Sequence, residues 1–69
     1  MTFSEALVLL RSYRRLSRPE YGFNYVYLTP NSAVSGNDLP VFAIRLGGGA
    51  PRIWFPTHED LLADDWFLV

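Results

Sequence analysis

Only one segment of this chain has the periodicity of a helix, which restricts the fold to one helix combined with extended structure. In TFSEALVLLRSYRRL the apolar residues recur at i, i+3, i+4 and i+7, as on one helical face: Phe3, Ala6, Leu7 and Leu10. Thr2 followed by Glu5 predicts a capping box at its start, because each side chain can accept a hydrogen bond from the other residue's N–H. We expect the helix to end near Arg14, since Pro19 prevents a longer continuation.

The remaining residues form short runs rich in aromatic and β-branched side chains, separated by turn residues. We expect strands at 15–18, 24–28, 41–46, 52–55 and 66–69, and a polar loop at 31–38. Gly47-Gly48-Gly49 predicts a plain hairpin turn, since no P-loop lysine or GxGxxG pattern accompanies it. Thr57 is expected to cap a short helical turn over His58 to Ala63, with Asp60 at the capping-box position. These elements predict an α+β fold over residues 1–69, a single domain with one N-terminal helix packed on a small antiparallel β-sheet and a short helical turn near the C-terminus.

The absence of cysteine bears on how so short a chain becomes stable. It excludes disulfides and thiolate metal sites, and a single histidine does not favour a transition-metal site, although carboxylates remain suitable for Mg²⁺ or Ca²⁺. We expect no metal and no cofactor. A chain of 69 residues buries a smaller fraction of its surface than a larger domain does, yet 49% of its residues are hydrophobic. We therefore expect part of the apolar surface to form an interface or a pocket, and the protein to be a homo-oligomer, dimer or tetramer.

All six cationic residues are arginines, and four of them fall between Arg11 and Arg18. Arg11, Arg14 and Arg15 are expected in the last helical turn, where cations interact favourably with the helix dipole. Guanidinium groups suit bidentate recognition of phosphate or carboxylate. The arginines therefore either contact a phosphate ligand or pair with acids across a subunit interface.

Charge and hydropathy exclude two classes of partner. The net charge of −1 gives no sign of a nucleic-acid partner. No apolar stretch approaches the ~20 residues that a membrane span requires, and the N-terminus lacks the basic region and cleavage site of a signal peptide. We expect a cytoplasmic protein without membrane association.

The run WFPTHEDLLADDW concentrates ionisable side chains between two tryptophans and is the obvious place to look for catalysis. Neighbouring positions on a helical turn point about 100° apart, so His58, Glu59 and Asp60 do not converge. The sequence offers no second histidine for a zinc pair and no Gly-flanked serine nucleophile. Acid/base work by Asp60 with Asp64 or Asp65 remains an alternative, but we do not expect an enzyme.

The favoured interpretation of this run is a capped turn. Thr57 and Asp60 are expected to form the cap, while Glu59 and Asp64 face water. The side chains expected to anchor the turn to the core are its two leucines, Leu61 and Leu62.

Aromatic residues interleaved with arginines are the most informative set for function. They are Tyr21, Tyr25, Tyr27, Trp54, Phe55 and Trp66, among Arg18, Arg45 and Arg52. Aromatic faces stack on bases and guanidinium groups bind phosphate, which together suit a nucleotide-like ligand. Alternation along a strand turns about half of these side chains inward, and it sets Trp54 opposite to Ile53 and Phe55. The residues alone thus indicate a small α+β binding module, with a nucleotide as a candidate ligand.

The whole chain resembles a family of small phage and prophage proteins, formerly a domain of unknown function and now the second family of Thoeris anti-defence proteins. The resemblance has three anchors in order: TFSEAL at 2–7, then RPEY at 18–21 with VYLTP at 26–30, and finally WFPT at 54–57 with DLLA at 60–63 and DW at 65–66. The last anchor is the most specific. The family typically has tryptophan in its Arg-x-x-Trp turn, whereas this chain has Tyr21.

The resemblance implies a function without chemistry. Members of the family act as molecular sponges that bind the cyclic ADP-ribose-type signal of a bacterial Thoeris enzyme, or related cyclic nucleotides. They sequester this signal intact as homo-oligomers, with pockets between protomers, so the Thoeris effector stays inactive. The resemblance implies that this chain sequesters such a signal in the cytoplasm of the infected bacterial host.

The resemblance also implies a set of ligand-binding residues. Tyr21 and Trp54 are the expected stacking surfaces, and Arg18 is the expected phosphate partner. Asn24 and Asp65 are expected to bond ribose hydroxyls or base edges, while Thr57 and Asp60 shape the turn. Trp66 is expected in the core, because it begins an apolar strand. The alternative function is a small adaptor that docks a host protein through its aromatic and arginine surface.

Overall fold

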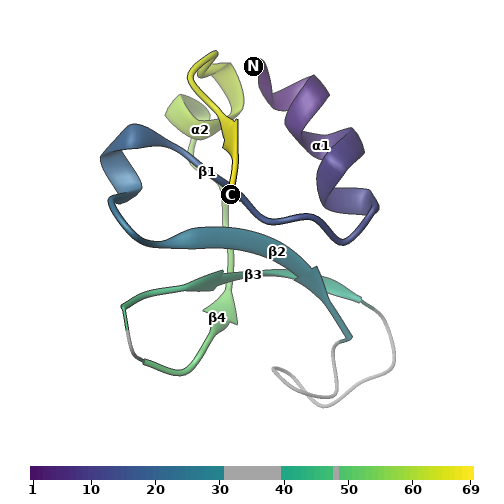
Figure 1. Ribbon diagram of the computed structural model, residues 1–69, viewed down its shortest axis with the longest axis vertical. Coiled ribbons are helices and arrows are strands. Elements are labelled where there is room, and N and C mark those ends of the chain that lie inside the picture. Colours follow the sequence, from purple (N-terminus) through teal and green to yellow (C-terminus); the bar gives the residue numbers. More distant parts are fainter. Residues whose placement is uncertain (31–39, 48) are drawn as a thin grey trace.

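The computed structural model of the chain describes residues 1–30, 40–47 and 49–69, so the expected 31–38 loop and Gly48 lie outside the described residues. The described elements are α1 (Phe3–Arg11), β1 (Leu16–Ser17), a 3₁₀ turn η1 (Pro19–Tyr21), β2 (Tyr25–Thr29), β3 (Val41–Arg45), β4 (Arg52–Ile53), α2 (His58–Leu62) and β5 (Phe67–Leu68) (Figure 1). The strands form one antiparallel sheet in the order β4-β3-β2-β1-β5. The predicted α+β class is confirmed.

Helix α1 begins as its sequence predicts but ends earlier. The Thr2 hydroxyl accepts from the Glu5 N–H, and the Glu5 carboxylate accepts from the Thr2 N–H, which confirms the capping box. The helix stops at Arg11, so the predicted end near Arg14 is wrong, and Arg14 and Arg15 lie outside the last turn. Tyr13 adopts a left-handed conformation with φ of 63°.

A pair of backbone hydrogen bonds explains this early end. The Tyr13 N–H donates to the Leu10 carbonyl at 3.0 Å, and the Arg14 N–H donates to the Leu9 carbonyl at 3.1 Å. This is the Schellman pattern, which satisfies the last carbonyls of the helix and turns the chain away. Glycine usually occupies the left-handed position, so a tyrosine there gave no sequence signal for the end of the helix.

The register of the sheet separates its two faces. Five residue pairs join β2 to β3, from Tyr25 opposite Arg45 to Thr29 opposite Val41. Strand β5 returns beside β1, with Leu16 opposite Leu68. Helix α1 packs on the face that carries Leu16 and Val26 (Figure 1). Alternation therefore directs Tyr25 and Tyr27 to the opposite face.

The core lies between α1 and the inner face of the sheet. Its buried members are Ala6, Leu10, Leu16, Val26, Trp54 and Trp66. The two tryptophan rings meet edge to face, with centroids 5.8 Å apart and planes at 85°, and this aromatic geometry is favourable. Trp66 therefore lies in the core, as expected. The tryptophans link the C-terminal segments to a core that begins with α1.

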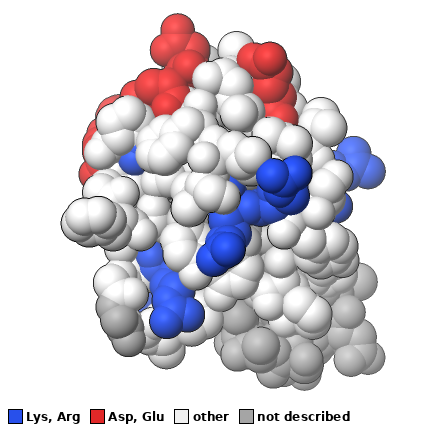
Figure 2. Space-filling view, viewed as in Figure 1, with Lys and Arg blue, Asp and Glu red and all other residues white. Residues whose placement is uncertain are grey.

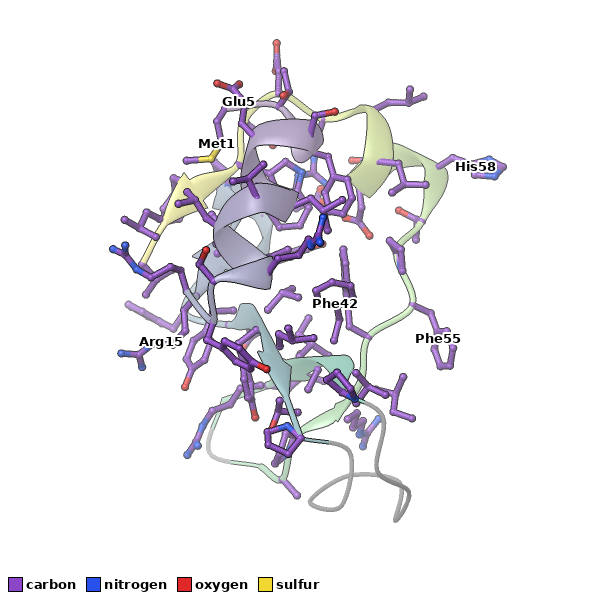
Figure 3. All side chains as sticks on the ribbon, turned by 90° about the vertical axis from the view of Figure 1, so that its right-hand side faces the viewer. Met1, Glu5, Arg15, Phe42, Phe55 and His58 are labelled. Atoms are coloured by element: carbon purple, nitrogen blue, oxygen red, sulfur yellow. The ribbon has the colours of Figure 1, made fainter. Side chains whose placement is uncertain are left out.

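Helix α2 is oriented differently from its prediction. Leu61 and Leu62 are 44% and 85% exposed, so the expectation that they anchor the turn to the core is wrong. Asp60 is the buried residue of α2, and successive helical positions turn about 100°, so the next two side chains point elsewhere. His58 and Phe55 project outward in Figure 3, and Arg15 projects on the opposite side of the molecule. The helix also ends at Leu62, with Ala63 as its C-cap.

The charges are separated along the molecule. Acidic residues gather at one end in Figure 2, over α2 and the start of α1, and arginines gather below them. Long-range contacts contribute to this arrangement, because α2 packs against α1 and Glu59 lies beside Glu20.

Candidate functional site

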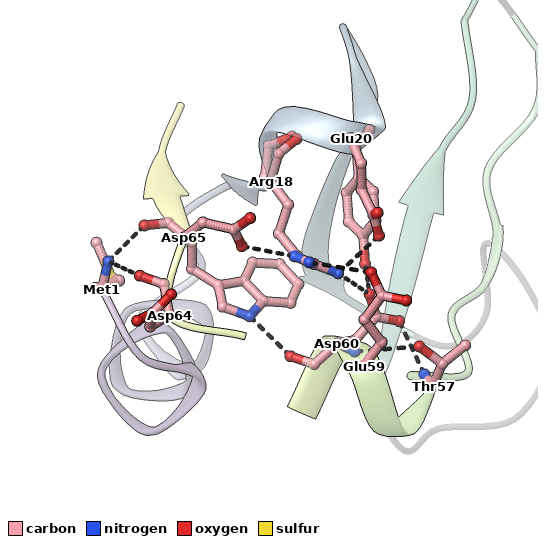
Figure 4. A network of polar contacts seen from close by, with 11 residues as sticks. Met1, Arg18, Glu20, Thr57, Glu59, Asp60, Asp64 and Asp65 are labelled. Carbon is pink, nitrogen blue, oxygen red and sulfur yellow. Dashed lines mark hydrogen bonds and ion pairs between the residues drawn. The ribbon is translucent and has the colours of Figure 1, made fainter. Parts of the chain in front are cut away.

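Arg18 is the centre of the main polar cluster of the described residues. It follows β1, is only 4% exposed, and extends toward α2 (Figure 4). Its Nε donates to Asp65 Oδ1 at 2.8 Å, and its Nη1 donates to Glu20 Oε1 at 2.7 Å and to Asp60 Oδ1 at 2.9 Å. Its Nη2 lies 3.6 Å from Glu59 Oε1. We call Arg18, Glu20, Tyr21, Glu59, Asp60 and Asp65 the Arg18 cluster.

Asp60 joins this cluster to the cap of α2. Its Oδ1 accepts from the Tyr21 hydroxyl as well as from Arg18, and its Oδ2 accepts from the Thr57 N–H at 2.8 Å. Its own N–H donates to the Thr57 hydroxyl at 3.1 Å, and its carbonyl accepts from the Trp66 indole at 3.0 Å. One buried aspartate thus holds the cap, the 3₁₀ turn and the core tryptophan together.

The pKa shifts follow from these contacts. Burial alone would raise the pKa of Asp60, but hydrogen bonds from Tyr21, Thr57 and Arg18 outweigh it and hold the pKa below its ordinary value. The hydrogen bond from Arg18 lowers the pKa of Asp65. Burial and the bond to Asp60 raise the pKa of Tyr21. Both aspartates are therefore ionised at neutral pH, and the tyrosine is a neutral donor.

The pKa of Glu20 is shifted in the opposite direction, above its ordinary value. Desolvation raises its pKa, and the neighbouring Glu59 adds to this against the opposing effect of Arg18. One guanidinium thus faces four carboxylates, from Glu20, Glu59, Asp60 and Asp65. An excess of negative charge opposes the approach of an anion. Since Nε, Nη1 and Nη2 of Arg18 all face carboxylates, the expected contact of Arg18 with a phosphate stays a prediction.

The structure brings together most of the residues that the sequence singled out. Arg18, Tyr21, Thr57, Asp60 and Asp65 lie in one connected network. The remaining two residues, Trp54 and Asn24, make other contacts.

Trp54 is 7% exposed, and its side chain lies beside the Tyr21 hydroxyl on the core side of the cluster. The Asn24 side chain instead accepts from the Gly47 N–H at 2.7 Å and ties β2 to the β3–β4 hairpin. The backbone carbonyl of Asn24 accepts from the buried Ser17 hydroxyl at 2.6 Å. The ligand contacts expected of both residues stay predictions.

Two members of the cluster were missed by sequence reasoning. Glu59 was expected to face water, and its side chain is indeed mostly exposed, yet it lies beside Arg18. Glu20 stands two residues after Arg18 in the 3₁₀ turn, and this local spacing is the one signal that points to their contact. The contact with Glu59 joins residues far apart in sequence, so no local pattern indicates it.

Within residues 1–30, 40–47 and 49–69 the structure encloses no pocket, and no group of three or more metal-binding side chains comes together. Among the same residues, neither helix has the length and apolar character needed to cross a bilayer.

The Arg18 cluster itself joins β1, η1, α2 and the segment before β5 by charge-assisted hydrogen bonds, which are stronger than neutral ones.

The fold and the Arg18 cluster define a class of small α+β protein, with one helix on a five-stranded antiparallel sheet and a buried arginine that ties the C-terminal segment to the sheet. A family profile described as the Thoeris anti-defense 2-like (Tad2-like) domain matches residues 1–69, and the chain belongs to this family. The resemblance found in the sequence is thereby confirmed, and it supports a role in phage defence against Thoeris immunity. No curated protein matches the chain.

Proposed function

We propose that this protein binds a cyclic ADP-ribose-type immune signal, or a related cyclic nucleotide, and sequesters it without cleavage, so that the Thoeris effector is not activated. The observation that carries the proposal is membership of the Tad2-like family along the whole chain. In this role the protein acts in the cytoplasm of the infected bacterial host. Removal of the signal needs tight binding and slow release but no turnover.

The proposed ligand site is built around the cluster. Tyr21 and Trp54 supply aromatic faces, and Arg18, Asn24 and Asp65 supply polar groups, while Thr57 and Asp60 hold the turn in place. Because the described residues enclose no pocket, a second copy of the chain is proposed to complete the site. Exposed apolar side chains on two segments support such self-association, namely Phe55, Leu61 and Leu62.

Sequestration is tested by mass balance. Purified protein in molar excess is mixed with cyclic ADP-ribose isomers, the free signal is measured after ultrafiltration, and the protein is then heat-denatured. We expect depletion of one isomer and its recovery, unchanged in mass and retention time, after denaturation. A cleaved product would refute sequestration in favour of catalysis, and an undepleted filtrate for every isomer would refute binding.

The oligomer is tested separately, by size-exclusion chromatography with light scattering. A mass of two or four chains is expected with and without ligand. A single-chain mass throughout the working concentration range would contradict a site completed by a second copy.

A second candidate function is an adaptor that docks a host protein. The observation that favours it is a turn that presents a fully exposed Phe23 after Gly22, whose φ is 63°. Exposed aromatic side chains of this kind serve as anchors at protein interfaces. A stoichiometric host protein that co-purifies with the wild type but not with Phe23→Ser, in the absence of bound nucleotide, would favour the adaptor.

A further inference from the structure

The face of the sheet opposite α1 carries a second group of aromatic and cationic side chains. Strand alternation sets Arg15, Tyr25, Tyr27 and Arg45 on this face, because their neighbours Leu16, Val26 and Ile44 pack in or against the core. We call these four residues the tyrosine–arginine face. Figure 3 shows Arg15 on the side of the molecule away from Phe55 and His58.

The four side chains of this face are close together. The Arg15 guanidinium carbon lies 5.3 Å from the centroid of the Tyr25 ring. The Tyr25 and Tyr27 rings have centroids 5.6 Å apart at 50°. Arg45 stands directly opposite Tyr25 in the β2–β3 ladder, a position in which side chains on one face are neighbours. One cation therefore lies over the Tyr25 ring, and a second stands opposite Tyr25 in the ladder.

These cations are not compensated in the way that Arg18 is. All the ion pairs recorded among the described residues belong to Arg18, and both Arg15 and Arg45 are exposed. In the view of Figure 2 the acidic residues gather at one end, and most of the arginines in view lie below them. Among the described residues, no carboxylate is paired with Arg15 or Arg45, whereas four carboxylates surround Arg18 and oppose an anion there.

The chemistry of the face suits a phosphorylated nucleotide. Guanidinium groups donate two hydrogen bonds to phosphate oxygens, and tyrosine rings stack on bases with little regard to base identity. We propose that the tyrosine–arginine face binds the phosphates of a nucleotide through Arg15 and Arg45, with Tyr25 or Tyr27 against the base. This inference rests on the proposed function in that the nucleotide is the sequestered signal. It places both the base and the phosphates of that nucleotide on this face, in place of the Arg18 cluster.

The test uses isothermal titration calorimetry with cyclic ADP-ribose isomers, and with ADP as a simple diphosphate probe. The variants are Arg15→Gln and Arg45→Gln, and the matched control is Arg52→Gln. Arg52 stands opposite Ile44 in the β3–β4 ladder, so it lies on the other face of the sheet. Equal oligomer mass and unfolding midpoint in all three variants exclude a general loss of structure.

The expected result is a loss of affinity of about 10-fold or more for Arg15→Gln and for Arg45→Gln, since each removes a charge-assisted hydrogen bond to phosphate. Arg52→Gln is expected to bind as the wild type does. If Arg15→Gln and Arg45→Gln bind as tightly as Arg52→Gln, the inference is overturned and the proposed function stands.

If the wild type binds none of the cyclic ADP-ribose isomers but binds ADP, and this binding is lost in Arg15→Gln and Arg45→Gln, the proposed function is refuted. Phosphate binding by the tyrosine–arginine face is then supported. Binding of a single-stranded oligonucleotide more tightly than ADP, lost in the same two variants, would overturn the nucleotide assignment and indicate nucleic acid instead.

Discussion

Replacing Arg18 with methionine removes the only buried cation of the described residues and keeps much of its aliphatic length. Asp60, which is buried, then loses its charged partner, and Glu20, Glu59 and Asp65 repel one another without compensation. The contacts of the guanidinium with the Tyr21 and Trp66 rings, 5.9 and 6.0 Å to their centroids, are lost as well. The change therefore acts on several elements at once.

The size of the expected loss in unfolding free energy is set by the buried ion pair of Arg18 with Asp60. Removing one partner of a buried ion pair costs about 3–5 kcal/mol, because the remaining charge is left without compensation. The total free energy of unfolding expected for a chain of 69 residues is only about 3–10 kcal/mol. We therefore expect Arg18→Met to lose a large part of the stability of the fold at neutral pH.

The sign of the pH dependence follows from the pKa of Asp60. In the wild type its lowered pKa contributes stability that is present above the ordinary value of about 3.9 and is lost as the pH falls through the folded-state pKa. Without Arg18, burial is opposed only by the hydrogen bonds from Tyr21 and Thr57, so the pKa of Asp60 rises relative to the wild type and protonation relieves the uncompensated charge at a higher pH. The stability difference between wild type and Arg18→Met should therefore shrink between pH 7 and pH 4.

The assay is urea unfolding at pH 7, 5.5 and 4, followed by the fluorescence of the core tryptophans, with Arg14→Met as the control. Arg14 is exposed and has no ion pair among the described residues. Equal destabilisation by the two variants, or a difference between wild type and Arg18→Met that is constant or larger at pH 4, would refute the reasoning.

Three further predictions concern the helix end, the core and the cluster. Tyr13→Gly should raise the free energy of unfolding by about 1 kcal/mol, since glycine adopts positive φ without steric cost; a lower urea midpoint would contradict it. Leu10→Ala should cost about 2–5 kcal/mol, whereas Leu62→Ala should change the monomer's stability by less than about 0.5 kcal/mol; similar losses in thermal unfolding, at a concentration where light scattering shows a single chain, would contradict the exposed position of Leu62. Tyr21→Phe should cost about 1.5–3 kcal/mol in urea unfolding, because a hydrogen bond to the Asp60 carboxylate is lost; unchanged stability would remove that bond from the cluster.

Much of the fold was predictable because its signals are local. Both capping boxes were identified from residues three apart, Thr2 with Glu5 and Thr57 with Asp60, and both are present. The strands follow the aromatic and β-branched runs, although β1, β4 and β5 are shorter than expected. Family membership was also readable, because motif spacing along the chain does not depend on the tertiary structure.

The features that the sequence misjudged depend on distant contacts. Leucines favour burial wherever they occur, but the inward position on α2 is taken by Asp60, since Arg18 and Tyr21 approach from residues about forty positions earlier and satisfy its charge. Leu61 and Leu62 are consequently turned outward.

By itself, then, the sequence determined which segments become helix and strand, where the N-caps of both helices lie, and to which family the chain belongs, because each depends on neighbouring residues or on the order of motifs along the chain. Only the tertiary structure decided that Arg18 is buried among four carboxylates while Arg15 and Arg45 stay exposed beside tyrosines. The physical reason is that the environment of a charge is set by the groups that folding brings around it, and identical arginine side chains carry no local signal of which will be compensated.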